Sequence, residues 1–272
     1  MVALPRAPRI EASGPDRRDL AVGPGGWTLR YDNPDGDWMA YDYRAAERRL
    51  SVSASLPWEI SSPPLCGVVC GVLLGLRQRT LLHGACLNLG GRSYGLLGAS
   101  GHGKSTLAAA LVRDGAAVLT EDLLVADRSA SGWIVEPGAP SLHLLEDSYA
   151  ALGSGLSRPA TARGGKYALD LSLPEDGICA GEAPLAGLYI LDPPAADGAA
   201  GLVRLKGRHA LLRLLDHLYG AAWIRPPGRS DLDFCSALAA EIPVYAVSRP
   251  WRLDGVRETA AMLRRHAETG AA

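Results

Sequence analysis

The sequence predicts an α/β fold in which helices flank a mixed, twisted sheet and a small β/helical layer precedes that sheet. Three observations support this fold class. From residue 81 onward, apolar runs of strand length alternate with longer helical segments. A glycine-rich loop at 98–105 separates one of these strands from the helix that follows it. Between residues 26 and 60, turn residues separate short runs with period-2 alternation, which is typical of β strands.

We expect an N-terminal part at 1–78 and a core at 79–272. Residues 1–25 are rich in proline, glycine and charge, so this tail is expected to be partly disordered. A turn at 33–36 interrupts the β layer, and an apolar helix follows at about 64–78. Its most apolar stretch is about 12 residues long, too short to span a bilayer, which predicts a buried helix.

The order of elements in the core follows from periodicity and from glycine and proline punctuation. We expect a hairpin at 81–97, a helix ending at 113, a strand at 116–120, a hairpin at 123–136, a short helix starting at 142, a mobile loop at 152–165, strands at 167–171 and 185–191, helices at about 207–220 and 230–240, a strand at 242–247 and a terminal helix at 253–268.

Composition narrows the classes of partner. The net charge is −1, so nothing indicates bulk electrostatic binding to nucleic acid. No signal-peptide pattern or long apolar span indicates a membrane. The five cysteines are scattered and form no C-x-x-C pair, which predicts core thiols in a reduced, cytoplasmic protein. Cys66 and Cys70 lie four residues apart, which leaves a metal site as the alternative for that pair.

The glycine loop (residues 98–105) reads G-A-S-G-H-G-K-S, which is a complete phosphate-binding pattern between a strand and a helix. Glycines let the backbone fold around an anion, and the helix N-terminus directs amides at it. Lys104 can reach β- and γ-phosphates, and the Ser105 hydroxyl can ligate magnesium. The residues expected to bind the nucleotide are Gly98, Ala99, Ser100, Gly101, His102, Gly103, Lys104, Ser105 and Thr106.

Phosphoryl transfer also needs carboxylates for the metal and for the acceptor. Glu121 and Asp122 follow a buried strand only one helix and one turn after Lys104, which predicts that both lie beside the phosphates. Two solvated loop acids are the alternative. Asp192 also ends an apolar strand and is a rival metal ligand, although prolines follow it directly.

The stretch from His83 to Asp122 resembles the HPr kinase/phosphorylase family, whose catalytic domain is related to phosphoenolpyruvate carboxykinase. The residues at 83–88 (H-G-A-C-L-N) are similar to a family strand that precedes the loop, with Asn88 for Asp. The glycine loop fits the family loop throughout, and Glu121-Asp122 stands at the spacing of the family's Asp-Asp pair. A further similar segment lies at 136–146, so the resemblance covers about residues 81–146.

The resemblance implies a P-loop core, ATP and Mg²⁺ as cofactors, and Glu121 as general base toward a serine hydroxyl. Because Glu is longer than Asp, Asp122 can share that task or serve magnesium, with Ser105, through water. His83 would lie near the acidic pair and tune it, and a core histidine is the alternative. His102 occupies a variable loop position. Arg158, Arg163 and Lys166 could form a cationic lid in the mobile loop, and Arg225, Arg229 and Arg249 are weaker candidates.

The chain departs from the family where a Glu-x-Arg-Gly segment and the C-terminal phosphorolysis signature are expected. These departures favour a kinase without the reverse reaction, similar to divergent members that accompany lasso-peptide pathways and phosphorylate a serine of a precursor peptide. A peptide or small-protein substrate is therefore expected, and the family's hexamers make a homo-oligomer an implied partner. The alternatives are a P-loop ATPase or switch with water as acceptor, a kinase of a small-molecule hydroxyl, and a nucleotide-binding protein without turnover. No N-K-x-D guanine motif occurs.

Overall fold

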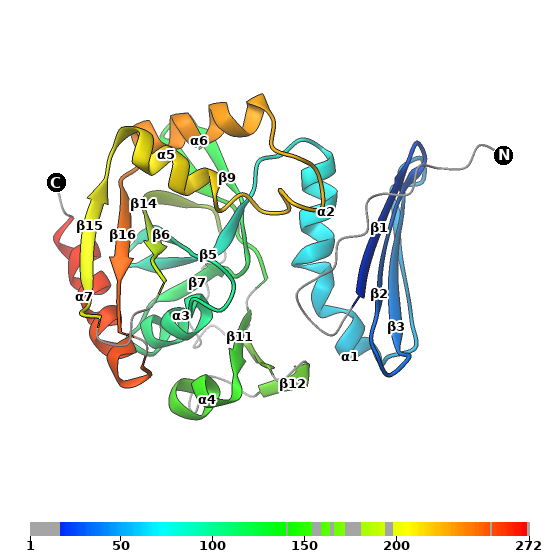
Figure 1. Cartoon of the computed structure of the whole chain (residues 1–272), viewed down its shortest axis with the longest axis horizontal. Helices are drawn as coiled ribbons and strands as arrows, with labels where there is room; N and C mark the ends of the chain where they lie inside the picture. The colour runs from blue at the N-terminus through cyan, green and yellow to red at the C-terminus, as the bar shows by residue number, and fades with distance from the viewer. Residues whose placement is uncertain are drawn as a thin grey trace. The chain divides into compact units, whose positions relative to one another are not determined.

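A computed structural model describes residues 17–139, 141–153, 159–163, 166–171, 181–193, 198–250 and 252–270 (Figure 1). The chain folds as two compact units. Unit 1 comprises Met1–Leu76 together with Gly220–Pro226, and unit 2 comprises Arg77–Tyr219 and Pro227–Ala272. The segment Gly220–Pro226 belongs to unit 1 although it is far away in sequence, which the sequence pattern did not indicate.

Unit 1 is an antiparallel sheet covered on one face by helix. Its strands pair in chain order: β1 (Arg17–Gly23), β2 (Gly26–Asp32), β3 (Trp38–Arg44) and β4 (Arg49–Ala54). The helical segments are α1 (Trp58–Ser61), the 3₁₀ turn η1 (Pro63–Leu65) and α2 (Val68–Leu76). Alternate residues of β2 and β3 pack against Val69 and Val72 of α2, with Leu29 and Tyr41 fully buried. Strand periodicity therefore leaves the other face of the sheet polar.

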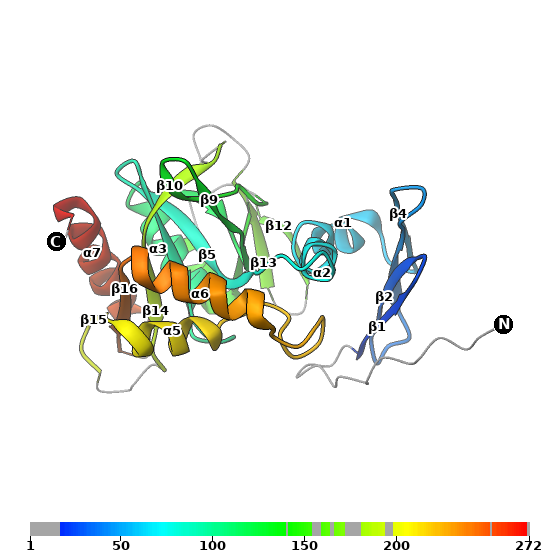
Figure 2. The same ribbon diagram turned by 90° about the horizontal axis from the view of Figure 1, so that it is seen from above.

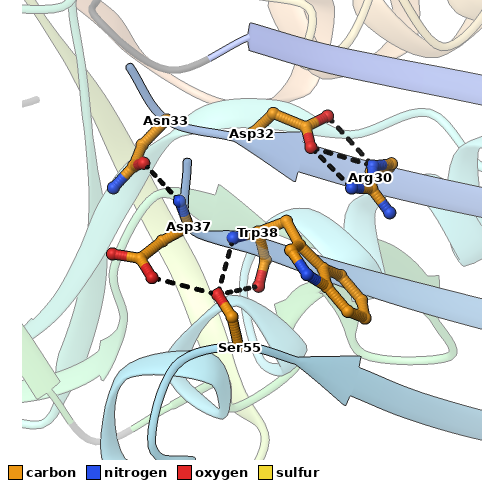
Figure 3. Close-up of polar contacts among 6 residues, drawn as sticks. All are labelled: Arg30, Asp32, Asn33, Asp37, Trp38 and Ser55. Atoms are coloured by element: carbon orange, nitrogen blue, oxygen red, sulfur yellow. Dashed lines mark hydrogen bonds and ion pairs between the residues drawn. The ribbon is translucent and has the colours of Figure 1, made fainter. Parts of the chain in front are cut away.

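The polar face of unit 1 is held by short-range contacts around the β2–β3 turn (Figure 3). The side-chain oxygen of Asn33 accepts the backbone N–H of Asp37 at 2.8 Å, which closes the predicted turn at 33–36. The Ser55 hydroxyl donates to Asp37 at 3.1 Å. Arg30 forms a bidentate ion pair with Asp32 and lies 4.7 Å above the ring of Trp38.

Two expectations for this part need correction. Residues 17–23 form strand β1 rather than a disordered tail, because their backbone pairs along the whole of β2. The expectation for residues 1–16 falls outside the described residues. The apolar helix is buried on one face only: over the helical stretch Trp58–Leu76, 28% of the apolar window is buried. With 19 residues and a mean hydropathy of 1.5, this stretch is long and apolar enough to cross a membrane by length and composition alone.

The main sheet of unit 2 has the order β15-β16-β14-β6-β5-β7, with β10 joining β14 to β9 and β8 pairing with β5. The bounds are β5 (Leu82–Leu89), β6 (Arg92–Leu97), β7 (Ala117–Thr120), β8 (Leu123–Leu124), β9 (Ala126–Ser129), β10 (Gly132–Val135), β14 (Ala183–Leu191), β15 (Gly201–Leu205) and β16 (Val244–Ser248). Parallel and antiparallel pairs are both present, so the predicted mixed α/β fold is confirmed at this level.

Helices cover both faces of this sheet, as Figures 1 and 2 show. One face packs against α3 (Lys104–Arg113) and α7 (Asp254–Thr269), and the other against α5 (Gly207–Leu215) and α6 (Arg229–Glu241). Alternate residues of β14 serve the two cores: Tyr189 and Leu191 face α3 and α7, while Leu188 and Ile190 face α5 and α6. Burial on both faces explains why this strand is a continuous apolar run.

A second, small sheet corrects two expectations. Residues 141–145 form strand β11 (Ser141–Leu145) rather than the start of a helix, and α4 (Glu146–Ser148) and the π-helical turn η2 (Tyr149–Gly153) follow it. The expected loop at 152–165 contains strand β12 (Pro159–Arg163), and β13 (Lys166–Asp170) pairs with both β11 and β12. Short apolar runs are ambiguous by periodicity, and here pairing with β13 decides the outcome. Arg158 lies outside the described residues.

Strand direction brings several strand ends to one edge of the main sheet, here called the loop edge. Strand β14 is parallel to β6, and β16 is parallel to β14. Strand β7 also runs parallel to β6, because both are antiparallel to β5. The carboxyl ends of β6, β7, β14 and β16 and the start of β5 therefore meet there. Ligands of open α/β sheets bind outside the carboxyl ends of strands, which makes this edge the candidate site.

Candidate active site

The glycine loop leaves β6 at Leu97 and enters α3 at Lys104. Gly101 and Gly103 have φ angles of 80° and 75°, in the left-handed region that side chains with a Cβ rarely adopt. Gly103 is the N-cap of α3, so the first amides of a ten-residue helix have no side-chain cap from that position. The loop therefore presents N–H groups and the positive end of a helix dipole, which together can hold an anion.

Lys104 folds back onto its own loop. Its Nζ donates to the carbonyl oxygens of Gly98 at 2.8 Å and Ala99 at 3.2 Å, and it lies 3.2 Å from Nε2 of His83. An ammonium only donates, so Nε2 of His83 accepts and the ring proton lies on Nδ1. That nitrogen is 3.1 Å from the carbonyl oxygen of Asp122, which fits donation from Nδ1–H. His83 therefore links Lys104 to the backbone of the acidic pair.

Glu121 is buried and contacts the helix that follows the glycine loop. The Ser105 hydroxyl donates to Oε1 of Glu121 at 2.7 Å. The backbone N–H of His143 donates to both carboxylate oxygens at 2.9 and 3.0 Å, and Nδ1 of His143 lies 2.6 Å from Oε2. Three groups, from helix α3 and strand β11, thus fix the orientation of the Glu121 carboxylate. The hydroxyl among them belongs to Ser105, the last residue of the glycine loop.

Asp122 differs from Glu121 in its exposure and in its backbone conformation. It is exposed, and its φ of 62° places it in the left-handed region. Its carbonyl oxygen accepts the backbone N–H of Gly84 at 3.2 Å, so β5 holds the strained backbone in place. The structure brings Glu121, and not Asp122, against Ser105. The two carboxylates therefore have different surroundings although they are adjacent in sequence.

Two other predicted loop residues make contacts of another kind. The Thr106 hydroxyl lies 3.0 Å from the buried hydroxyl of Ser148 in α4, so it links helix α3 to that segment. His102 is half-buried, and its Nδ1 lies 3.5 Å from the carbonyl oxygen of Leu191. The exposed residues of the loop are Ala99, Ser100 and Gly101.

The rival acid Asp192 lies at the same edge, directly after β14. Its carboxylate accepts Nη2 of Arg213 at 2.8 Å, and both side chains are about one-third exposed. Arg213 already compensates the negative charge of Asp192. The backbone carbonyl oxygen of Asp192 accepts Nη1 of Arg249 at 2.8 Å. Compared with Glu121, Asp192 has a cation as its partner and not a loop hydroxyl.

A second histidine lies behind the loop edge. The carbonyl oxygen of His217 accepts the backbone N–H of His83 at 2.8 Å. Burial lowers the pKa of His217 to about 4, and the positive charges of Arg213 and Lys104 act in the same direction against Asp216. His217 is therefore neutral at pH 7. The ring centroid of Tyr219 lies 5.8 Å from that of His83, so Tyr219 limits the space in which the His83 ring can move.

Sequence reasoning missed His143 and gave Arg249 little weight. Reading 141–145 as a strand would have separated His143 from its buried neighbours Leu142 and Leu144, because alternate residues face opposite sides. Arg249 directly follows the last strand, β16, where ligand-binding residues of α/β sheets gather. Among the described residues, no group of three or more His, Cys, Asp or Glu side chains is arranged to hold a metal ion.

The chain was compared with protein families, curated proteins and solved structures. No protein-family model and no curated protein matches the sequence. Among solved structures, the Hpr(Ser) kinase/phosphatase from Coxiella burnetii is similar, with a TM-score of 0.35 and 11% sequence identity. The similarity covers 70% of this chain and 97% of that chain. Nothing about substrate or chemistry follows from a similarity of this degree.

Proposed function

We propose that this protein is an ATP-dependent kinase that transfers the γ-phosphate to a serine hydroxyl of a peptide or small protein. One observation carries the proposal: a buried carboxylate, Glu121, receives the hydroxyl of Ser105 beside a glycine loop that also carries Lys104. A phosphate cradle, a hydroxyl–carboxylate pair and a lysine are the parts that phosphoryl transfer needs in one place.

The donor set fits ATP and magnesium. Mg²⁺ prefers oxygen ligands and is usually held by one or two carboxylates together with substrate phosphates and water. Ser105 and Glu121 supply a hydroxyl and a carboxylate oxygen 2.7 Å apart, at the N-terminal turn of α3. When bound, the metal would neutralise charge on the transferred phosphoryl group. Lys104 would exchange its bonds to Gly98 and Ala99 for phosphate oxygens.

We assign different tasks to the two acids. Glu121 accepts bonds from Ser105 and from His143, so its oxygens are committed to the metal side of the site. Asp122 is exposed, which leaves its carboxylate accessible to an incoming hydroxyl. We therefore propose Asp122 as the general base that takes the serine proton, and Glu121 as the group that orients Ser105 and the metal. The family resemblance implied Glu121 as the base and left open that Asp122 shares or takes over that task.

The choice of acceptor rests on the resemblance described above, within which a lasso precursor peptide is one candidate. The test is mass spectrometry of serine-bearing peptides encoded beside the gene, incubated with the protein, ATP and magnesium. We expect one added phosphate group on a peptide serine, and none with Lys104→Ala. ADP release without a modified peptide would contradict the peptide acceptor and favour water or a small-molecule hydroxyl. No ADP release from the parent protein would contradict the kinase itself.

A further inference from the structure

Arg249 is a buried arginine at the loop edge whose guanidinium is only partly used. It directly follows β16 and is 6% exposed. Its Nη1 donates to the carbonyl oxygen of Asp192 at 2.8 Å. Its Nη2 is buried and has no hydrogen-bond partner among the described residues. A buried donor without an acceptor destabilises a fold, and such groups in native proteins call for an explanation.

The unpartnered nitrogen lies beside the glycine loop. Nη2 is 3.9 Å from the position that a Cβ on Gly103 would take. Gly103 is the N-cap of α3, so this nitrogen stands where the free amides of that helix begin. The bond from Nη1 to Asp192 fixes the guanidinium plane, because the five donors of arginine form a rigid fork.

The charge balance around Arg249 points to an anion. Burial lowers the pKa of Arg249 and the negative charge of Asp192 opposes that effect, yet arginine keeps its proton in proteins. The carboxylate of Asp192 is already paired with Arg213, so Arg249 receives only a carbonyl oxygen from that residue. In unit 2, the other buried nitrogen without a hydrogen-bond partner among the described residues is Nε2 of His266, in the last turn of α7.

We propose that Arg249 is a phosphate-binding residue: Nη2 donates to a phosphate oxygen of the nucleotide held by the glycine loop. This inference rests on the proposed function, because it takes the loop to be a nucleotide site. It adds a second cation from the same chain to the one that Lys104 supplies. An arginine at this point would bind phosphate with a directed hydrogen bond, whereas Lys104 acts as a point charge.

The test measures the dissociation constants of ATP and ADP by calorimetry for the parent protein, for Lys104→Ala and for three further variants. Arg249→Met removes the guanidinium and keeps an apolar stem of similar length. Arg249→Lys keeps the charge and loses the fork. Arg257→Met, on the exposed side of α7, is the matched control. We expect Arg249→Met to weaken binding about 10- to 100-fold, Arg249→Lys to weaken it less, and Arg257→Met to leave it unchanged.

The pattern of loss identifies the phosphate and separates binding from structure. A loss for ATP alone would place Nη2 on the γ-phosphate, and a loss for both nucleotides would place it on the phosphates that they share. The unfolding midpoint of the nucleotide-free Arg249→Met variant should stay near that of the parent. The substitution removes one satisfied hydrogen bond, which stabilises the fold, together with one buried unpartnered donor, which destabilises it. Should Arg249→Met fail to fold, the affinity of Arg249→Lys decides.

Three results would overturn the proposal, and they are distinguishable. If the Arg249 variants bind both nucleotides within twofold of the parent while Lys104→Ala loses binding, the loop is a nucleotide site and Arg249 has no part in it. If the parent protein binds neither nucleotide, the proposed function fails and this inference fails with it. A lower unfolding midpoint with unchanged affinity also contradicts the proposal, because it assigns Arg249 a structural role.

Discussion

Two arginines, Arg30 of unit 1 and Arg249 of the loop edge, are held in different ways. Arg30 is paired with Asp32 and lies over the ring of Trp38. Arg249 donates to a carbonyl oxygen, and its buried Nη2 has no hydrogen-bond partner among the described residues.

This difference distinguishes a cation that the folded chain satisfies from one that has an unused hydrogen-bond donor. A cation that rests on a carboxylate or an aromatic ring is satisfied by the folded chain itself. A buried, unpartnered donor beside the glycine loop, such as Nη2 of Arg249, would gain from a bound anion such as a nucleotide phosphate. Native proteins tolerate such local inconsistency mainly where a ligand completes the structure. The predictions below test this contrast from the site outward.

The largest effect is expected at the acidic pair. Asp122→Asn should lower kcat about 100- to 10,000-fold with nucleotide affinity within twofold, because a general base contributes to the chemical step. Glu121→Gln should instead raise the magnesium concentration for half-maximal rate about tenfold. Glu258→Gln, an exposed acid on α7, is the control for both. Steady-state phosphorylation rates at varied magnesium measure both effects.

The opposite outcome would reassign the roles. If Asp122→Asn keeps its rate and Glu121→Gln loses it at saturating magnesium, Glu121 is the base that the resemblance implied. If both variants keep full rates, the acceptor chemistry lies elsewhere and Asp192 becomes the next candidate.

A smaller effect is expected at His143, which touches Glu121 rather than the reacting groups. His143→Phe keeps the two backbone bonds to the carboxylate and loses the ring contact of 2.6 Å. Because the ring is one-third exposed, we expect only a three- to tenfold rise in the magnesium requirement, about 0.6–1.4 kcal/mol. His143→Asn, which can still donate, should recover part of it. An unchanged magnesium requirement in His143→Phe would show that Glu121 needs no support from the ring.

The sequence predicted the centre of this site better than its walls. Loop 98–105 and Glu121 are near in sequence and joined by one helix, so spacing alone predicted that they lie close together. His143 and Arg249 come from strands whose neighbours depend on sheet order, which a single sequence does not specify. Strand β15 went unpredicted for the same reason: Val203 is 65% exposed, and only pairing with β16 makes this segment a strand.

The lowered pKa of His217 predicts how the free energy of unfolding depends on pH. Its folded pKa of about 4 lies below the ordinary value of 6.5, chiefly because of burial. Between these values the unfolded chain binds a proton that the folded chain does not, so the free energy of unfolding falls as pH falls. Urea unfolding at pH 7, 6 and 5 should show the parent losing stability relative to His217→Gln. A difference that is independent of pH would mean that His217 is not held neutral.

The smallest effect is expected in unit 1, where the polar contacts are satisfied within the fold. Asn33→Ala removes the bond that closes the β2–β3 turn and should destabilise that turn by about 0.5–1.5 kcal/mol. Amide exchange along β2 and β3 should rise, while ATP affinity and ADP release stay unchanged, because the contacts of Asn33 serve only the turn. Asn33→Asp, which keeps the acceptor, is the matched control. A loss of ATP affinity in Asn33→Ala alone would break the contrast, since it would couple a satisfied structural turn to the nucleotide site.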